Sequence, residues 1–237
     1  GIPEDFIGIL PHGVDPELFF FDETTCVSRN QETVFLNIGK FQLRKGHDVL
    51  LEAFNLAFEP KDPVRLVVHG INPLMNEDED QSWIRQFKES KMGSRIEISH
   101  TLFDNQRELI DLMRSADCGV FPARAEGWNL ELLEMMALGK HVIATNYSGH
   151  TEFADHDNCR LISVSKLEKT NMTYANFGKQ NAFSREGHWA FIGKDEVEQL
   201  VYYLRELHLM KQAEQLETNR AGITTARKHT WENAAKI

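Results

Sequence analysis

Short apolar runs alternate with amphipathic stretches along most of the chain. Apolar runs of strand length occupy residues 33–39, 64–70, 95–98, 118–122, 141–145 and, more weakly, 160–162. Apolar residues at helical spacing fill the intervals at 46–58, 83–91, 106–115 and 130–138. This alternation predicts an α/β fold, a Rossmann-like doubly wound parallel sheet with helices on both faces. Ligands of such sheets bind beyond the carboxyl ends of the strands.

Three stretches depart from the alternation. Residues 1–20 contain two prolines and a glycine near their middle and are expected to form an interdomain linker, followed by one domain over 21–237. Within that domain, residues 166–192 mix glycine and asparagine with aromatic residues and are expected to form an irregular insertion. Residues 195–210 and 213–228 predict two C-terminal helices.

Composition and charge exclude several classes of protein. The chain has 26 Lys and Arg against 36 Asp and Glu, a net charge of −10, which argues against a nucleic-acid partner. No apolar run is long enough to predict a membrane span. Cys26, Cys118 and Cys159 form no CxxC pair, so we expect neither a disulfide framework nor a zinc site, and a reducing, cytoplasmic location. The acidic run 76–80 reads as a solvated loop.

A basic turn follows the first predicted strand and opens the first predicted helix. It runs from Gly39 and Lys40 to Arg44, Lys45 and Gly46. Amides at a helix start favour anions, and three cations within six residues add to this, so the turn is a candidate phosphate site. A solvated basic turn is an equally good interpretation. The turn is neither a P-loop nor a dinucleotide fingerprint.

A second loop lies between the strand at 118–122 and the helix at 130–138. Asn129 is a suitable N-cap for that helix, and the amides of residues 127–130 could face ligand oxygens. Glu126 and Glu134 lie eight residues apart, which is roughly 12 Å at helical rise and suits both ends of a sugar nucleotide. In a Glu-rich chain such a pair also arises by chance, and Trp128 could be a core aromatic.

Together these segments resemble the nucleotide-sugar domain of retaining GT-B glycosyltransferases of family 4. Gly39-Lys40 and Lys45-Gly46 match the spacing of the family's Gly-Arg and Lys-Gly pairs, with Lys in place of Arg at 40. Glu126 and Glu134 match the family's E-x7-E motif. Further similar segments are 10–15 (the junction of the two GT-B domains), 138–152 (the next strand and glycine turn) and 229–231 (the closing helix).

The resemblance implies a role for Gly39, Lys40 and Lys45 on the phosphate side of the site. Lys45 would bind the diphosphate of a sugar nucleotide with assistance from Lys40, and Gly39 would lie in the same turn. Lys at position 40 keeps the charge of the family's arginine but loses its bidentate fork. Glu126 would face the hexose hydroxyls and the reacting centre, so Glu126 and Lys45 are the expected catalytic residues.

The remaining donor-binding roles fall on the second loop and its helix. The amides of Gly127, Trp128, Asn129 and Leu130 would line the hexose and phosphate, and the family often has glycine where Asn129 stands. The carboxylate of Glu134 would accept both ribose hydroxyls. The base would lie near His100 and Thr101, after a strand end.

The implied function is the donor-binding half of a retaining glycosyltransferase. It would transfer a hexose from a UDP- or GDP-sugar to an acceptor held by an N-terminal domain that this chain lacks, so the chain alone should transfer little sugar. No cofactor or metal is expected, because cations replace the metal in such enzymes, and residues 155–157 read as a turn rather than a metal motif. The alternatives are another GT-B sugar-nucleotide enzyme, such as an epimerase, and a non-catalytic nucleotide-sugar-binding module.

Overall fold

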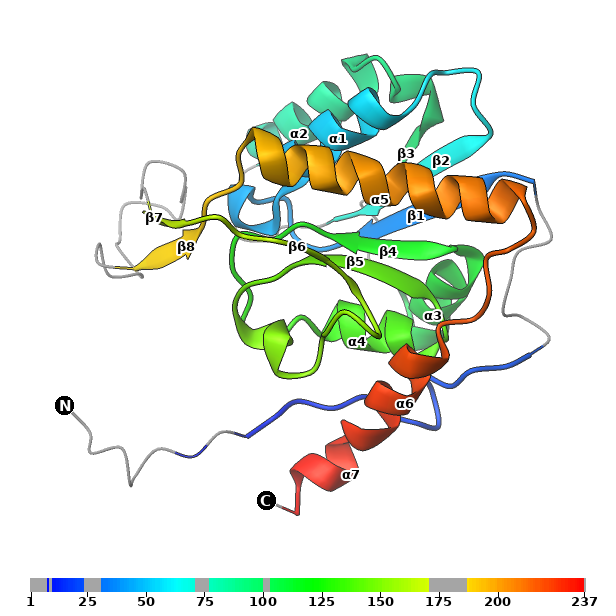
Figure 1. Ribbon diagram of the computed structural model, residues 1–237, viewed down its shortest axis with the longest axis vertical. Helices are drawn as coiled ribbons and strands as arrows, with labels where there is room; N and C mark the ends of the chain where they lie inside the picture. Colours follow the sequence, from blue (N-terminus) through cyan, green and yellow to red (C-terminus); the bar gives the residue numbers. More distant parts are fainter. Residues whose placement is uncertain are drawn as a thin grey trace.

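A six-stranded parallel sheet forms the centre of the molecule (Figure 1). The computed structural model describes residues 8, 10–23, 31–70, 77–99, 103–170 and 187–236. The strands are β1 (Thr33–Ile38), β2 (Val64–His69), β3 (Ile96–Ser99), β4 (Cys118–Phe121), β5 (His141–Thr145) and β6 (Arg160–Ile162). Their order is β3-β2-β1-β4-β5-β6, with every neighbouring pair parallel. The predicted doubly wound α/β fold is confirmed.

Helices cover both faces of the sheet. They are α1 (His47–Ala57), α2 (Glu77–Glu89), α3 (Gln106–Ser115), α4 (Leu130–Ala137), α5 (Lys194–Gln212), α6 (Arg220–Lys228) and α7 (Trp231–Ala234). The described residues also form the short 3-10 turns η2 (Leu43–Lys45), η3 (Gly93–Arg95) and η4 (Gly149–Glu152). Helices α1, α2 and α5 lie on one face, and α3 and α4 lie on the other (Figure 1).

Strand β1 shows why the apolar runs are nearly continuous. All six of its residues are buried. Leu36 and Ile38 pack with the α3 and α4 side of the core, while Phe35 packs with the α1 and α5 side. A strand covered on both faces needs apolar residues at successive positions, which is typical of parallel sheets between helices.

The direction of winding reverses between β1 and β4. The chain proceeds outward from β1 through β2 to β3, then returns to the other side of β1 and continues through β4, β5 and β6. Such a reversal is the topological switch point, where open α/β sheets bind their ligands. The reversal therefore places the carboxyl ends of β1 and β4, with the loops 39–46 and 122–129, side by side.

Two predictions of local structure are wrong. The acidic run 76–80 was expected to be a loop, but α2 begins at Glu77; residue 76 lies outside the described residues. Acidic residues in a first helical turn are favoured by the helix dipole. Residues 213–228 were expected to form one helix, but α6 starts only at Arg220. Glu214 has a φ of 57°, a left-handed conformation that ends the preceding helix.

The predicted insertion at 166–192 contains a small strand pair. β7 (Leu167–Lys169) and β8 (His188–Ala190) pair antiparallel outside the main sheet. Residues 171–186 of the insertion lie outside the described residues.

The second half of the predicted linker packs on the C-terminal helices. The Val14 amide donates to the His229 carbonyl at 3.0 Å, and the Trp231 amide donates to the Val14 carbonyl at 3.3 Å. Val14 and Phe19 are buried with the α3 and α4 side of the core. The entering chain and the end of the domain are therefore joined to one another.

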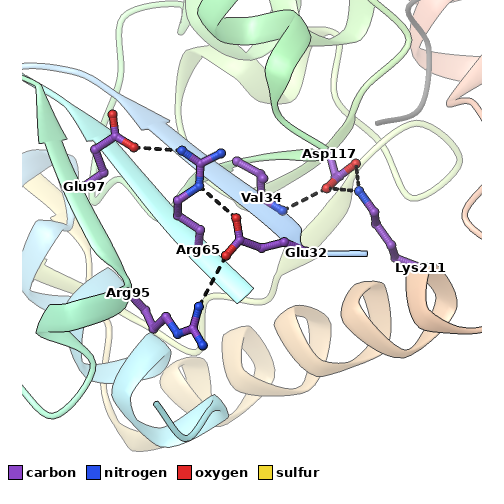
Figure 2. A network of polar contacts seen from close by, with 7 residues as sticks. All are labelled: Glu32, Val34, Arg65, Arg95, Glu97, Asp117 and Lys211. Atoms are coloured by element: carbon purple, nitrogen blue, oxygen red, sulfur yellow. Dashed lines mark hydrogen bonds and ion pairs between the residues drawn. The ribbon is translucent and has the colours of Figure 1, made fainter. Parts of the chain in front are cut away.

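The amino-terminal edge of the sheet carries a buried ion pair (Figure 2). Lys211 reaches from α5 to Asp117, with its Nζ 2.6 Å from both carboxylate oxygens, and the two side chains are 5% and 1% exposed. Asp117 Oδ2 also accepts a 2.8 Å hydrogen bond from the Val34 amide at the start of β1. A neighbouring surface network joins Glu32 and Arg65, among others, at the same edge (Figure 2).

Candidate functional site

The loops after β1 and β4 are in direct backbone contact. Gly46 has a φ of 75°, and a Cβ on it would lie 1.9 Å from the Pro122 carbonyl oxygen. Only glycine at position 46 allows the backbones of these two loops to approach so closely. The Arg124 amide donates to the Arg44 carbonyl at 2.7 Å. The structure therefore brings the basic turn and the glutamate loop together at the switch point.

Lys45 projects from this contact toward the glutamate loop. Its Nζ lies 2.8 Å from Glu126 Oε1 and 3.6 Å from Glu131 Oε1. Its stem runs over Gly39, where an added Cβ would meet Lys45 Cδ and Cε at 3.3 Å. Arg44 Nη1 lies 2.9 Å from the other oxygen of Glu126. One carboxylate thus pairs with two adjacent cations.

The two cations keep Glu126 ionised. Its side chain is only 7% exposed, and burial by itself would raise the pKa of the carboxyl group. The charges and hydrogen bonds of Lys45 and Arg44 outweigh burial and lower the pKa of Glu126 below its ordinary value. The site therefore holds a carboxylate between cations at neutral pH.

The side chain of Arg124 links the two loops by hydrogen bonds. Its Nη1 and Nη2 donate to the two carboxylate oxygens of Asp48, each at 2.8 Å, in the bidentate geometry of strong Arg–carboxylate pairs. Its Nη1 also donates to the Leu43 carbonyl at 2.7 Å. A single buried side chain thus joins the loop after β4 to η2 and to the first turn of α1.

Replacing Arg124 with methionine is expected to lower the free energy of unfolding by about 1–3 kcal/mol. The Leu43 carbonyl loses a donor and Asp48 loses its partner, although Asp48 is partly solvated. Urea unfolding measures the change, with the exposed Arg107→Met on α3 as the matched control. Equal unfolding midpoints for the two variants would contradict this role of Arg124.

The start of α4 presents unpaired polar groups. Asn129 occupies the N-cap position as predicted, but its side chain makes no capping hydrogen bond, which corrects the expected cap. Its φ of 69° is left-handed, a conformation that glycine and asparagine tolerate best. Among the described residues, neither its side-chain oxygen and nitrogen nor the Trp128 Nε1 has a hydrogen-bond partner, although all are buried. The amides of residues 127–129 likewise donate to no described residue.

The ring of Trp128 packs among other aromatic rings. Its centroid lies 5.3 Å from that of Phe153, 6.0 Å from His12 and 6.2 Å from His229. The side chain is partly buried and packs against the core on the α3 and α4 side, close to the interpretation of Trp128 as a core aromatic. Its backbone lies at the start of α4.

Glu134 lies one turn further along α4, which begins at Leu130. Burial, with a smaller contribution from the nearby Glu131, raises the pKa of Glu134 to about 8. Its carboxyl group makes no hydrogen bond to a described residue. It is therefore a largely protonated carboxyl group at neutral pH, with hydrogen-bonding capacity to spare.

Three residues that build this site were given no individual role by the sequence, although Arg44 was counted among the cations of the basic turn. Arg44 and Arg124 have been described above, and the third is Ser148, whose hydroxyl accepts a 2.7 Å hydrogen bond from the Glu126 amide. A Cβ on Gly149, its neighbour, would lie 1.8 Å from the Gly127 carbonyl oxygen. Ser148 and Gly149 fall in the glycine turn that the sequence singled out, which was the available signal.

The contacts described above include none of the predicted donor-binding residues Lys40, His100 and Thr101. Lys40 is exposed and makes no ion pair within the described part of the chain. His100 and Thr101 lie outside the described residues. Beside that gap, the His69 ring at the end of β2 stacks on Phe103 with centroids 4.3 Å apart.

The described residues bear on two further possibilities, a metal site and a membrane-spanning helix. They contain no group of three or more His, Cys, Asp or Glu side chains that could hold a metal ion. None of their helices is long and apolar enough to cross a membrane.

A family model, described as glycosyl transferases group 1, matches residues 25–172, more than half of the chain. The chain belongs to this glycosyltransferase family. The matched residues include both loops of the site and all of the strands from β1 to β6. Together with the sheet order, this gives the glycosyltransferase domain the Rossmann-like architecture of the GT-B enzymes.

Two curated proteins are similar to part of this chain. Mannosylfructose-phosphate synthase of Agrobacterium fabrum is 26% identical over 174 residues, which are 65% of this chain and 38% of that protein. The uncharacterized glycosyltransferase MJ1607 of Methanocaldococcus jannaschii is 26% identical over 164 residues, 65% of this chain and 40% of that protein. The matched regions thus cover well under half of these relatives.

Solved structures share the fold of the glycosyltransferase domain. The C-terminal domain of a group 1 glycosyl transferase from Francisella tularensis superposes with a TM-score of 0.62 and 19% identity, covering 91% of this chain and 98% of that one. A glycosyltransferase from Rickettsia africae gives a TM-score of 0.72 at 15% identity, covering 99% of this chain and 56% of that one. Anabaena Alr3699/HepE, in complex with UDP and glucose, gives 0.66 at 15% identity, covering 94% and 53%. The fold is that of the C-terminal half of GT-B glycosyltransferases.

Proposed function

We propose that this domain is the donor-binding half of a retaining glycosyltransferase that takes a hexose from a UDP- or GDP-sugar. The observation that carries the proposal is the convergence at the switch point, where Lys45 and Glu126 meet at 2.8 Å beside the mouth of α4. Cations and unpaired amides at one place suit a diphosphate. The UDP complex of the Anabaena relative, on the same fold, supports a nucleotide-sugar ligand.

Each group of the site has a role in this proposal. Lys45 and the amides of residues 127–129 bind the diphosphate, and Glu126 faces the hexose. As the anomeric C–O bond breaks, negative charge grows on the diphosphate, and fixed cations and amides stabilise that charge more than the ground state. Glu134 binds the ribose hydroxyls, which would give its carboxyl group the hydrogen-bond partners that the described residues do not supply.

Titration of UDP, GDP and ADP into the 237-residue chain tests the proposal. Lys45→Ala and Glu134→Ala should each weaken binding of the preferred diphosphate by about tenfold, since each removes a hydrogen bond involving a charged or buried group. The exposed residues Lys61 and Glu52 supply the matched controls, Lys61→Ala and Glu52→Ala. Absence of binding for all three diphosphates, or unchanged affinity in both site variants, would overturn the proposal.

The acceptor is proposed to bind to a second domain. The regions that match the curated relatives are only 38% and 40% of those proteins, so acceptor-binding residues would come from elsewhere. The 237-residue chain should then bind donor but transfer little sugar. Turnover of a labelled nucleotide sugar by this chain alone, at about 1 s⁻¹ or faster, would contradict this.

A further inference from the structure

Two cations close to Glu126 are adjacent in sequence. Lys45 Nζ lies 2.8 Å from Glu126 Oε1, and Arg44 Nη1 lies 2.9 Å from Glu126 Oε2. The resemblance to the family would instead assign the second phosphate cation to Lys40. Lys40 is exposed and forms no ion pair with a described residue. Two of the three cations of the basic turn, those at its C-terminal end, therefore lie against Glu126.

The side chain of Arg44 is held in place by hydrogen bonds, but several of its N–H donors have no acceptor among the described residues. Its Nη1 donates to the Ala125 carbonyl and to Glu126, and its own carbonyl accepts from the Arg124 amide. Its Nη2 and Nε make no hydrogen bond to a described residue, and the side chain is 37% exposed. A guanidinium group has five N–H donors, so three of them remain available on a group that is already positioned.

We propose that Arg44, rather than Lys40, is the second cation that binds the donor diphosphate, and that the diphosphate competes with Glu126 for Arg44 and Lys45. The inference rests on the proposed function. A planar guanidinium group binds phosphate oxygens in pairs, whereas an ammonium group acts as a point charge. Arg44 therefore supplies the fork that a lysine at position 40 does not.

Competition follows from the charges in the site. Glu126 places one negative charge between two positive charges, so an arriving diphosphate must share or take over both cations. Once these contacts move to the diphosphate, the carboxylate is released toward the hexose side of the site. Removing the charge of Glu126 should then strengthen binding of a free nucleoside diphosphate, although the same change should impair sugar transfer.

The test compares the affinities of matched variants for UDP and GDP and for the nucleosides uridine and guanosine. Arg44→Gln should weaken binding of the preferred diphosphate by about tenfold or more, because a hydrogen-bonded charge is lost. Lys40→Gln should change it less than about twofold. Glu126→Gln should strengthen it by about threefold to tenfold. The affinity for the nucleoside should be unchanged in all three variants. If Arg44→Gln only disturbed the structure of the site, it would weaken binding of the nucleoside as well.

The outcomes separate this inference from the proposed function. If wild-type protein binds diphosphate and Lys45→Ala weakens it, but Lys40→Gln is as damaging as Arg44→Gln or more so, the assignment of Arg44 is wrong and the proposed function stands. Weaker diphosphate binding in Glu126→Gln would overturn the competition. If wild-type protein binds none of the diphosphates, the proposed function fails and the inference fails with it.

Discussion

Replacing Lys211 with methionine is expected to lower the free energy of unfolding by about 3–5 kcal/mol. Methionine keeps most of the volume of the lysine stem, so the packing of α5 changes little. What is lost is the partner of Asp117, whose side chain is 1% exposed and 2.6 Å from Lys211 Nζ. A buried carboxylate without its cation bears the full cost of desolvation. Urea or thermal unfolding of the domain measures the loss.

Two further variants separate charge from packing. Lys194→Met, on the same helix but 85% exposed, should change stability by less than about 1 kcal/mol. Adding Asp117→Asn to Lys211→Met should recover part of the loss, because the uncompensated charge is gone while an amide oxygen can still accept from the Val34 amide. A Lys211→Met protein as stable as Lys194→Met would show that the buried pair contributes nothing.

Glu134 is expected to make the domain less stable as pH rises from about 5 to about 8. Its pKa is raised from the ordinary 4.5 to about 8 in the folded protein, so the folded state holds a proton that the unfolded state releases above pH 4.5. Stability from this group is complete below the unfolded pKa and is lost as pH rises toward the folded pKa. At about 1.4 kcal/mol for each unit of pKa, the loss reaches about 2–5 kcal/mol.

Glutamine at position 134 should abolish this particular dependence. The difference in unfolding free energy between wild type and Glu134→Gln should change across pH 5 to 8.5, with the variant gaining relative stability at the higher pH. The exposed Glu52→Gln on α1 supplies the control, for which the difference should stay flat. Parallel pH profiles for wild type and Glu134→Gln would mean that the carboxyl group of Glu134 titrates normally.

The hydrophobic pattern predicted the strands because the sheet is buried on both sides. Every position of β1 needs an apolar or packed residue, so the run is visible in the sequence. The order of the strands is not visible in such a pattern, because it depends on which way each crossover turns. Only the structure shows that β1 and β4 are neighbours, and this neighbourhood is what brings the two loops together.

Helix boundaries were less predictable where side-chain type and backbone conformation disagree. Glutamate is a good helix former, so the sequence gives no sign that Glu214 adopts the left-handed conformation that separates α5 from α6. The acidic start of α2 was predicted to be a loop because a run of like charges is typical of solvated loops. The helix dipole, which favours acidic residues in a first turn, makes a helix start equally compatible with this run. Both errors concern one to two turns at a helix start and leave the fold unchanged.

The motifs of the candidate site could be predicted from the sequence, but the contacts between its side chains could not. Gly39, Lys45, Glu126 and Glu134 stand out by spacing, and the structure brings Lys45 and Glu126 into contact. Arg44 sits in the same basic turn, but its contact with Glu126 spans 82 residues and has no local signature. Their roles in donor binding remain predictions for the experiments above.

The double backbone link between Val14 and the segment from His229 to Trp231 acts as a clasp. The segment that enters the domain and the segment that ends it are therefore held together at one place, by hydrogen bonds on both sides of Val14. That point adjoins His12, whose ring lies 5.4 Å from Trp231 and 6.0 Å from Trp128. The ring of His12 therefore connects Trp231, at the end of the domain, with Trp128, in the loop that carries Glu126.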